Sequence, residues 1–500
     1  MNTMSDVCII KKDGTLEPFD EQKIVAAVTK SAARVMYKFK AEEYDRIVEW
    51  VKSHLLESEL KNVPIQTMHN LVESALEDIK PDVAKSYRDY RNYKIDFVNM
   101  LDDVYRKAQN IMYIGDKENS NTDSALVATK RSLIYNQLNK ELYKKFFLTN
   151  DEKQAINDGY IYIHDMSARR DTMNCCLFDM GKVLKGGFEM GNLWYNEPNS
   201  LAVAFDVIGD VVLDTAFDVM GDIILSTAAQ QYGGFTVPEI DKILAPYAEK
   251  SYAKYYNEIK TIMEDMKGNV LSLDDLKYIE QKAMKKIKRD FEQGFQGIEY
   301  KLNSVGSSRG DYPFITITFG LSKERFGRMA SITALEVHSG GQGKNGNKKP
   351  VLFPKLVFLF DENLHGDGKP LEDVYNAAID CSSKTMYPDW LSLTGDSYVA
   401  EAYKKYGVVI SPMGCRAFLS LWFERGGMEP ADENDKPVVV GRFNIGAISL
   451  HLPMILAKSR SESRDFYEVL DYYLEMIRNL HKRTLDYLGE MRASTNPVAY

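Results

Sequence analysis

The sequence is organised around residues 406–427, YGVVISPMGCRAFLSLWFERGG. This stretch begins with a short β-branched run at 407–410 and breaks at 411–414, where a proline and a glycine occur. A run bounded in this way predicts a buried strand that leads into a tight loop, with Cys415 at the tip of the loop. A lone cysteine among apolar residues is usually a small buried hydrophobe, so the local sequence favours a structural thiol over a reactive one.

Length, composition and charge limit the class of protein. A chain of 500 residues suggests about three average domains, or one small domain and one large one. The hydrophobic share of 44% and the charged share of 27% are ordinary for globular proteins. The net charge of -9 argues against non-specific nucleic-acid binding. Since the sequence also lacks a signal peptide and a stretch apolar enough to span a bilayer, we expect neither nucleic acid nor membrane as a partner.

The five cysteines are thinly spread, and no C-x-x-C occurs: Cys8, Cys175, Cys176, Cys381 and Cys415. Neither a disulfide framework nor a zinc site is indicated, so we expect no metal site and a reducing, cytoplasmic location. The neighbouring pair Cys175-Cys176 seldom forms a structural disulfide, because the ring that it would close is strained. A reactive role and a pair of buried hydrophobes both stay open for these two residues.

The first twenty residues predict a β-hairpin that precedes several helices. A strand at 7–10 is followed by Lys11-Lys12-Asp13-Gly14, whose Asp-Gly is a hairpin signal, and the chain returns at 15–19. Asp20 can cap a helix over 21–35. Amphipathic patterns predict further helices over 41–60, 65–79 and 83–112. One hairpin and a few helices are enough for a separate small domain.

Four charged residues surround the predicted turn and the following helix start: Lys11, Lys12, Glu17 and Lys23. Three cations and one acid suit an anionic ligand such as a nucleoside triphosphate. The alternative is a solvated basic turn, which the local sequence alone favours.

The middle of the chain predicts a domain boundary and a carboxylate-lined helix. The polar residues 113–123 are the best candidate for the boundary, ahead of a helix over 124–147. A strand over 160–163 ends at His164-Asp165, and the apolar segment 201–229 carries aspartates at 206, 210, 214, 218 and 222. A spacing of four lines these carboxylates along one helical face. Because stacked carboxylates repel one another, a solvated face is favoured over a metal site.

Three apolar runs, at 311–320, 351–360 and 438–453, predict core strands. Because proline cannot donate a hydrogen bond to a neighbouring strand, Pro354 predicts that the second run lies at a sheet edge or contains a bulge. Asn444, between apolar neighbours in the third run, needs hydrogen-bond partners, which a hydroxylated substrate could supply. The glycine-rich, basic segment 340–350 does not match the P-loop pattern, and we interpret it as a mobile loop that can contact phosphate. A final helix is predicted over 467–491.

Two resemblances to known families follow from these motifs. The residues Val7-x-x-Ile10-Lys11-Lys12-Asp13-Gly14, Phe19-Asp20 and Lys23-Ile24 resemble the ATP-cone, a nucleotide-sensing domain, and the resemblance covers residues 1–97. Residues 159–500 resemble the catalytic part of the anaerobic, class III ribonucleotide reductases. The matched motifs are HD at 164–165, NCCLFDMGKVLKGGFEMGN at 174–192, QYGGFTVPEID at 231–241, FPKLVFLF at 353–360, GCRAFLS at 414–420, GRFNIGAISLHLP at 441–453 and ASTNP at 493–497.

The resemblance implies an α/β fold. The expected architecture is a ten-stranded α/β barrel of the ribonucleotide reductase and glycyl-radical type, with a finger loop through its centre, preceded by a small and mostly helical ATP-cone. The expected domains are the ATP-cone at 1–97, a helical connector at 98–158 and the catalytic barrel at 159–500.

The resemblance also implies roles for individual residues. Cys415 matches the cysteine that becomes a thiyl radical and abstracts hydrogen from C3′ of the ribose. Cys175 matches the second catalytic thiol, and the choice between Cys175 and its neighbour Cys176 stays open. Asn444 matches a residue at the ribose hydroxyls, and His164, Cys176, Ser494 and Thr495 are expected at the substrate. Lys11, Lys12, Glu17 and Lys23 are expected to bind ATP or dATP.

The implied activity is the anaerobic reduction of ribonucleoside triphosphates, with formate as reductant and ATP or dATP as allosteric effectors. The implied partners are a radical-SAM activating enzyme and a second copy of the chain. The family stores its radical on a glycine near a four-cysteine zinc site. This sequence shows neither motif before Tyr500, so we expect a truncated chain or part of a split enzyme.

Two other functions are considered. One is a catalytically inactive nucleotide-sensing regulator. The other is a different glycyl-radical enzyme, such as a relative of formate acetyltransferase. Those enzymes carry adjacent cysteines on the finger loop, whereas Cys415 stands alone there.

Overall fold

The computed structural model describes residues 7–11, 13–58, 60–113, 125–170, 172–190, 193–203, 215–268, 270–304 and 310–492. The chain divides into two compact units, Met1–Lys107 and Ala108–Tyr500. Most of the predicted boundary segment, residues 114–123, lies outside the described residues. Among the described helices, none is both long and apolar enough to cross a membrane.

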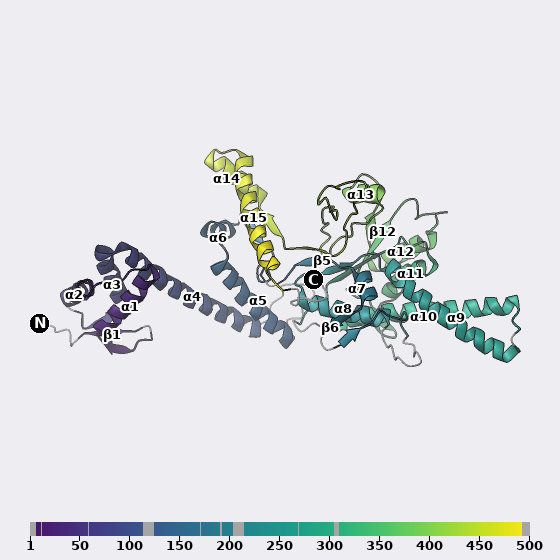
Figure 1. The fold of residues 1–500 in the computed structure, drawn as a ribbon, viewed down its shortest axis with the longest axis horizontal. Coiled ribbons are helices and arrows are strands. Elements are labelled where there is room, and N and C mark those ends of the chain that lie inside the picture. Colours follow the sequence, from purple (N-terminus) through teal and green to yellow (C-terminus); the bar gives the residue numbers. More distant parts are fainter. Residues whose placement is uncertain are drawn as a thin grey trace. The chain divides into compact units, whose positions relative to one another are not determined.

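The first unit combines a three-stranded sheet with helices (Figure 1). Strand β1 (Cys8–Ile10) pairs antiparallel with β2 (Leu16–Pro18) and parallel with β3 (Asn62–Pro64). The predicted hairpin is therefore confirmed. The helices are α1 (Glu21–Arg34), α2 (Ala41–Glu57), α3 (Ile65–Ile79) and the first part of α4 (Pro81–Tyr113). Asp20 caps α1 as predicted, because its carboxylate accepts a hydrogen bond of 2.9 Å from the backbone N–H of Gln22.

Apolar stripes on these helices form a core within the first unit. Val28, Ile47, Val51 and Leu76 are almost fully buried, and Val63 of β3 joins them. Fully burying such a side chain contributes roughly 1.5–3 kcal/mol. Most of the stability of these helices therefore comes from packing of the apolar faces rather than from intrinsic helix propensity.

The second unit is built on a six-stranded sheet with the order β13-β12-β9-β8-β5-β14 (Figure 1). Its strands are β5 (Cys175–Leu177), β8 (Phe235–Val237), β9 (Ile315–Phe319), β12 (Lys355–Phe360), β13 (Asp389–Ser392) and β14 (Arg442–Asn444). All neighbouring strands are parallel except β14, which runs antiparallel to β5 at one edge. Parallel neighbours need long crossovers, and helices supply them: α7 (Met180–Gly186), α8 (Ala216–Gln230), α9 (Ile240–Lys267), α10 (Leu273–Ser304), α11 (Arg325–Gly340) and α12 (Glu372–Thr385).

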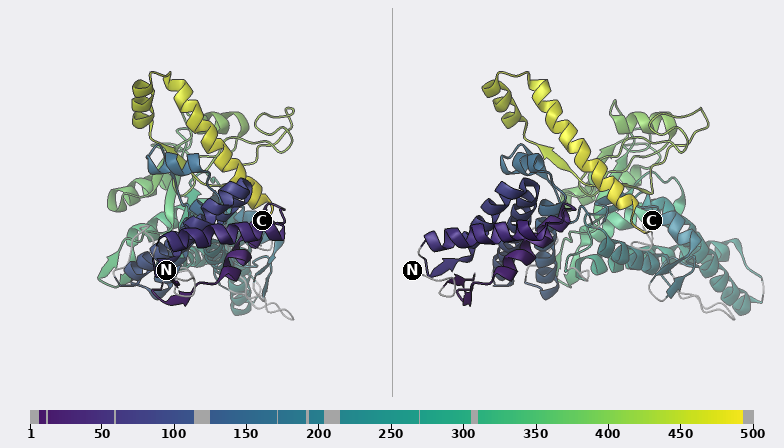
Figure 2. Two further views of the ribbon diagram at one scale, coloured as in Figure 1. Left: turned by 90° about the vertical axis from the view of Figure 1, so that its left-hand side faces the viewer. Right: turned by 60° about the vertical axis from the view of Figure 1, so that its left-hand side comes forward.

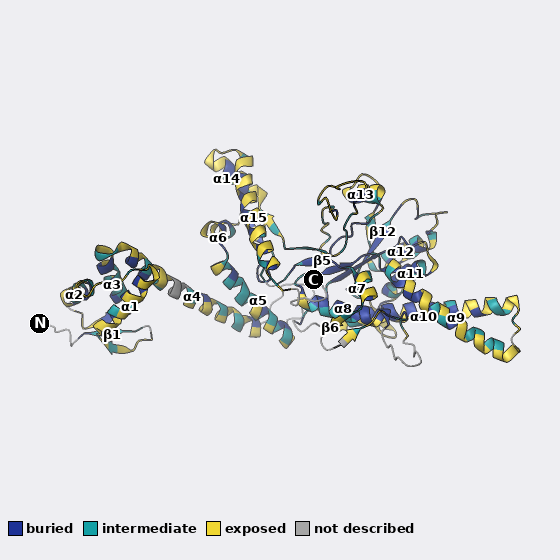
Figure 3. Cartoon of the chain, viewed as in Figure 1, coloured by how far each residue is buried: buried dark blue, intermediate teal, exposed yellow. Residues whose placement is uncertain are grey.

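The two faces of this sheet differ in chemistry, as strand β9 shows. Ile315, Ile317 and Phe319 point into the large core that the helices cover. Thr316 and Thr318 alternate with them and lie on the opposite face. All five side chains are buried, so both faces of the sheet are covered (Figure 3).

Helices α9 and α10 pack side by side as a long helical hairpin (Figure 1). Where the hairpin meets the core, Tyr255 donates a 2.8 Å hydrogen bond to Asp290. Gly294 lets the two layers approach, because a Cβ there would lie 2.1 Å from the ring of Phe217 on α8. The distal ends of both helices are exposed (Figure 3), with Met266 and Leu273 each 77% exposed.

A third apolar cluster lies beside the sheet in the second unit. It joins α5 (Val127–Phe146), α6 (Asn150–Asn157), β4 (Ile161–Ile163), β15 (Ile448–Leu450), α14 (Leu452–Glu462) and α15 (Phe466–Gly489). Strands β4 and β15 pair antiparallel, and α14 packs against α15 (Figure 2). The remaining elements are β6 (Phe188–Met190), β7 (Leu193–Tyr195), β10 (Gln342–Lys344), β11 (Asn347–Lys349) and α13 (Tyr398–Tyr406).

The predicted strand at 407–410 is wrong. Gly407 ends α13 in the left-handed conformation, and the next three residues form no ladder with the sheet. Val409 and Ile410 are nevertheless buried. The segment lies across the face of the sheet, where Ser411 contacts Thr318, so it is buried without being a strand. An apolar β-branched run signals burial, and here burial was obtained without strand pairing.

Two further predictions from apolar or glycine-rich runs need correction. Strand β12 lies inside the sheet between β9 and β13, because Pro354 directly precedes the strand and removes no ladder hydrogen bond from it. Residues 340–350 contain a β-hairpin, since β10 pairs antiparallel with β11 around the turn at 345–346.

The predicted helix over 201–229 begins only at Ala216 in the structure. Asp206, Asp210 and Asp214 lie outside the described residues. Asp218 is exposed and Asp222 is half-buried, and they lie 3.5 Å and 3.8 Å from the ammonium of Lys301. This agrees with a solvated carboxylate face. The ten-stranded barrel stays a prediction, because the described residues form a six-stranded sheet.

Candidate active site

The turn that carries Cys415 is closed by its own backbone. The N–H of Met413 donates to the carbonyl of Ala417 at 2.9 Å, and the N–H of Arg416 donates to the carbonyl of Met413 at 2.7 Å. Arg416 has a φ of 66°, in the left-handed region that residues other than glycine seldom adopt. Cys415 lies at the exposed tip of this turn, as the Pro-Met-Gly break predicts.

Buried threonines of the sheet hold the segment that leads into the turn. The hydroxyl of Thr236 on β8 donates to the carbonyl of Pro412 at 2.7 Å, and the hydroxyl of Thr318 lies 3.3 Å from that of Ser411. An irregular segment that is buried must find partners for its backbone groups. The threonines on this face provide such a partner, which a purely apolar strand could not do.

Two glycines allow the loop to lie close to the ring of Phe314. A Cβ on Gly234 would come within 2.2 Å of this ring, and a Cβ on Gly414 would come within 2.4 Å. Any larger residue at either position must displace the ring or the loop. Close packing against Phe314 therefore holds the turn in place together with the hydrogen bonds.

Strand β5 separates the two neighbouring cysteines. Cys175 packs with Met413 of the loop, whereas Cys176 points into the large core on the other face. The sulfur of Cys176 lies 3.4 Å from the side-chain amide of Gln231, and burial raises the pKa of Cys176 to about 12. Of the pair, Cys175 is the residue that faces the loop of Cys415.

The thiol of Cys175 lies 3.7 Å from the side-chain oxygen of Asn174. The neighbouring Cys415 and burial raise the pKa of Cys175, so that residue keeps its proton. The neighbouring Cys175 lowers the pKa of Cys415 to about 6, helped by backbone N–H groups of the turn and by the Arg416 guanidinium. The two thiols thus form one unit, although 240 residues separate them in sequence (415 minus 175).

Asn444 lies directly opposite Cys175, because β14 pairs with β5 in that register. Its side-chain N–H₂ points at the sulfur of Met413, 3.7 Å away, and its oxygen accepts a 2.8 Å hydrogen bond from the N–H of Gly446. The predicted residues Cys415, Cys175 and Asn444 are therefore gathered around one loop residue, Met413.

His164 lies in a different setting from that cluster. Its Nε2 is 2.7 Å from the hydroxyl of Ser449, in the β4–β15 pair. The adjacent Asp165 has the closer link to the thiols, because its carboxylate hydrogen-bonds Asn174 and the sulfur of Cys175 lies 3.7 Å from the Asn174 side-chain oxygen. Burial raises the pKa of Asp165, and the Asn174 hydrogen bond opposes that rise.

Several predicted residues are not brought to the thiols by the described structure. Ser494, Thr495 and Lys12 lie outside the described residues. In the first unit, Glu17 pairs with Lys11 at 2.5 Å and also with Lys23, so these three charged side chains form one cluster beside the hairpin. Whether the cluster binds a nucleotide stays a prediction.

The sequence reasoning missed the residues that support the two thiols. They are Met413, Thr236, Thr318, Phe314, Gly234 and Asp165. A signal was present for the threonines: strand β9 reads Ile-Thr-Ile-Thr-Phe, which places hydroxyls at every second position of a buried strand. Buried hydroxyls need partners, so this alternation indicates that a polar segment covers one face.

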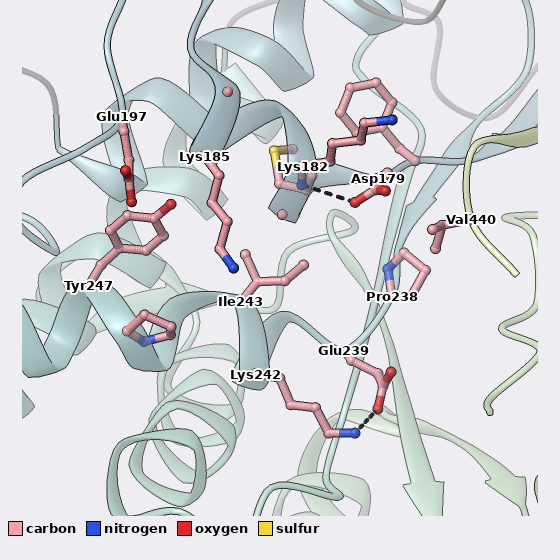
Figure 4. A pocket seen from close by; sticks show the side chains of 15 residues that line it. Asp179, Lys182, Lys185, Glu197, Pro238, Glu239, Lys242, Ile243, Tyr247 and Val440 are labelled. Atoms are coloured by element: carbon pink, nitrogen blue, oxygen red, sulfur yellow. Dashed lines mark hydrogen bonds and ion pairs between the residues drawn. The ribbon is translucent and has the colours of Figure 1, made fainter. Parts of the chain in front are cut away.

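A separate cavity of about 720 Å³ lies between α7 and the start of α9 (Figure 4). Lys182, Lys185, Lys242 and Glu239 are among its lining residues, and Lys242 pairs with Glu239. None of the lining residues is a cysteine, so this cavity is not the place of thiol chemistry. Among the described residues, no group of three or more histidine, cysteine or acidic side chains could hold a metal ion.

Comparison with known families assigns both units. Residues 118–500 match the family model "Anaerobic ribonucleoside-triphosphate reductase", and residues 7–95 match the ATP cone domain. The chain belongs to the anaerobic ribonucleoside-triphosphate reductase family. Its first unit contains an ATP cone domain.

Individual members of the anaerobic reductase family resemble between about three quarters and nearly all of the chain. The anaerobic ribonucleoside-triphosphate reductase of Haemophilus influenzae is 30% identical over 99% of this chain and 65% of its own length. That of Enterobacteria phage T4 is 32% identical over 77% of this chain and 58% of its own length. A Thermotoga maritima anaerobic ribonucleotide reductase, solved with dATP and CTP, aligns over 82% of this chain and 63% of its own with a TM-score of 0.46 and 13% identity.

The chain thus spans about 65% of the length of the first of these relatives. Family membership rests on the sequence matches over both units.

Proposed function

We propose that this chain takes part in the anaerobic reduction of ribonucleoside triphosphates to deoxyribonucleoside triphosphates by thiyl-radical chemistry. One observation carries the proposal: Cys175 packs with Met413 of the turn that carries Cys415, and Asn444 lies directly opposite Cys175. Three residues from distant segments, each of a type that the reaction needs, meet at one turn. This grouping argues against an inactive regulator, in which no such arrangement of thiols would be required.

In the proposed reaction Cys415 carries the radical once it has been delivered to that sulfur. The thiyl removes the hydrogen atom from C3′ of the ribose, which leaves a thiol on Cys415 and a radical on C3′. Packing of the turn against Phe314 and its hydrogen bond to Thr236 keep the Cys415 sulfur in one position. Such positioning matters because a displacement of about 1 Å can cost on the order of 100-fold in rate.

Loss of the 2′-hydroxyl as water is assigned to the opposite side of the sugar. Cys175, which keeps its proton, supplies a hydrogen on that side, and Asn444 holds the ribose hydroxyls with its side-chain amide. With formate as reductant the overall reaction is balanced: ribonucleoside triphosphate, formate and one proton give deoxyribonucleoside triphosphate, carbon dioxide and water. Cys415 recovers its radical when the hydrogen returns to C3′.

The first unit supplies regulation in this proposal. ATP and dATP bind at Lys11, Lys12, Glu17 and Lys23, and Ser494 and Thr495 contact the substrate phosphates. We further propose a homodimer in the cytoplasm, activated by a radical-SAM enzyme. The match of residues 7–95 to the ATP cone domain supports the regulatory part.

Replacing Cys415 by alanine tests the proposal. Anaerobic conversion of labelled CTP to dCTP, with formate, ATP and the activating enzyme present, should be abolished in Cys415→Ala. ATP binding, measured by calorimetry, should stay unchanged, because the substitution lies in the other unit. Cys176→Ala is the matched control, since that thiol faces the core, and it should retain reduction.

Turnover that survives in Cys415→Ala would rule out the thiyl role. If the wild-type protein binds ATP but reduces no nucleotide even when fully activated, the inactive regulator becomes the better description.

A further inference from the structure

A strained arginine lies directly next to Cys415. Arg416 adopts a φ of 66°, in the left-handed region that is sterically unfavourable for a residue other than glycine. Strain of this kind persists only where the surroundings hold it. The contacts of the Arg416 side chain identify what holds it here.

The Arg416 guanidinium ties the turn to the sheet at two strands. Its Nε donates a 2.6 Å hydrogen bond to the carboxylate of Asp389, the first residue of β13, and Nη2 contacts the same oxygen. Its Nη1 lies 3.5 Å from the hydroxyl of Thr316 on β9. A planar fork suits such a multiple contact, and an ammonium group cannot reproduce it.

The same guanidinium also closes the turn on itself. Nη1 donates a 3.1 Å hydrogen bond to the carbonyl of Gly414, on the other side of Cys415 in sequence. The backbone on both sides of Cys415 is thereby fixed to one group, which is in turn fixed to β13. Lys355 faces the Arg416 guanidinium from the start of β12, the strand between β9 and β13. Burial and the Arg416 charge lower the pKa of Lys355.

We propose that Arg416 and Asp389 act together as positioning residues that hold the turn of Cys415 in its place on the sheet, near Cys175. Neither side chain needs to touch substrate for this role. The inference rests on the proposed function for its biological meaning, because it names the device that places the radical cysteine. The test of the positioning role does not need nucleotide reduction, so the positioning role and the proposed function can fail separately.

The test uses the reactivity of Cys415 as a reporter of its position. The rate of alkylation by iodoacetamide is measured across pH, with peptide mass spectrometry to assign each cysteine. In the wild-type protein we expect the pH midpoint of Cys415 alkylation to lie below that of an ordinary thiol, because the neighbouring Cys175 and backbone N–H groups of the turn lower the pKa of Cys415. A turn that moves from its place loses these influences, and the midpoint then rises.

Asp389→Asn is the decisive variant, because a positioning role and a purely electrostatic role predict opposite changes in the alkylation midpoint of Cys415. The charged or titratable groups that face Cys415 are Arg416, Asp389, Lys355 and Cys175. Removing the Asp389 carboxylate would lower the pKa of Cys415 if only charge mattered, since a nearby negative charge disfavours the thiolate. The positioning role requires the midpoint to rise. A midpoint that falls or stays constant in Asp389→Asn overturns the proposal.

Two variants of Arg416 distinguish the effects of its positive charge, its backbone strain and its side-chain contacts on the position of Cys415. Arg416→Lys keeps the charge but loses the fork, and Arg416→Gly relieves the backbone strain but loses the side chain. Both should raise the midpoint and slow anaerobic CTP reduction by about tenfold or more. If Arg416→Gly behaves as wild type, the guanidinium does not position the turn.

The chain offers a matched control pair a few residues away. Arg425 donates a 2.6 Å hydrogen bond to Asp432, another arginine–aspartate pair in the same stretch of chain. Arg425→Lys and Asp432→Asn should leave the Cys415 midpoint unchanged. Cys176 and Cys381, which are buried, should stay unmodified in every variant, and this shows that the protein remains folded.

Discussion

Cys175 and Cys176 are adjacent in sequence but lie in opposite environments, because successive side chains of a strand point to opposite faces. Cys175 faces the loop, where it packs with Met413, whereas Cys176 lies beside Gln231. The resemblance to the family left the choice between the two open. The geometry favours Cys175 as the second reactive thiol.

The pH dependence of Cys415 is expected to follow from its neighbour Cys175. A neutral thiol beside a thiolate stabilises the charged form, so Cys175 lowers the pKa of Cys415. Cys175→Ala should therefore raise the pKa, shift the alkylation midpoint of Cys415 to higher pH and slow alkylation at pH 7. Cys176→Ala should leave the midpoint where it is. Equal midpoints in Cys175→Ala and wild type would contradict an interaction between the thiols.

At the scale of elements, the loop and the sheet depend on each other through buried hydroxyls. Segment 411–414 is irregular yet buried, and the threonines of β8 and β9 supply polar partners where it crosses them. An apolar residue in place of such a threonine would leave a buried carbonyl without a donor, which costs free energy. The alternating threonines are thus part of the active-site architecture.

Thr236→Val tests this element-scale statement. Valine keeps the shape of threonine but removes the hydroxyl that donates to the Pro412 carbonyl at 2.7 Å, so the free energy of unfolding should fall by about 1–3 kcal/mol. Thr333→Val is the control, because the Thr333 hydroxyl is buried on α11 without a hydrogen-bond partner in the described structure. Denaturant unfolding should show Thr333→Val at or above wild-type stability. A loss of equal size in both variants would indicate a general cost of the substitution.

At the scale of the whole molecule, two units each have a separate core. The core of the first unit is formed by residues between Val7 and Tyr87, and the largest core of the second unit begins at Met173. Separate cores can unfold separately, so a single unfolding transition is not required for this chain. A ligand that binds only one unit should stabilise only that unit.

Calorimetric unfolding with and without ATP checks this expectation. We expect two unfolding transitions. ATP should shift only the transition of the first unit to higher temperature, because at 100 times its Kd it adds about 2.7 kcal/mol to the free energy of unfolding of that unit. Lys23→Gln should remove that response, because Lys23 belongs to the charged cluster with Glu17. Lys30→Gln, an exposed position on the same helix, is the control and should respond like wild type. A shift of both transitions by ATP would contradict independent units.

The sequence by itself determined the elements whose signals are local. The first hairpin, the cap of α1 at Asp20, helix α3 and the core strand β9 were predicted from turn residues and apolar periodicity. Motif order also identified the family and nominated Cys415, Cys175 and Asn444. These features depend on neighbours within a few residues or on the order of motifs, and both are readable along the chain.

Only the tertiary structure decided which thiol faces the loop, why β-branched residues at 408–410 form no strand, and what holds Arg416 in a left-handed conformation. Each answer depends on residues far apart in sequence: Cys175 meets Cys415, Thr318 meets Ser411, and Asp389 meets Arg416. Sheet register and burial create these contacts. Cys415, which the local sequence suggests is a small buried hydrophobe, is exposed, and the fold brings a second thiol near it.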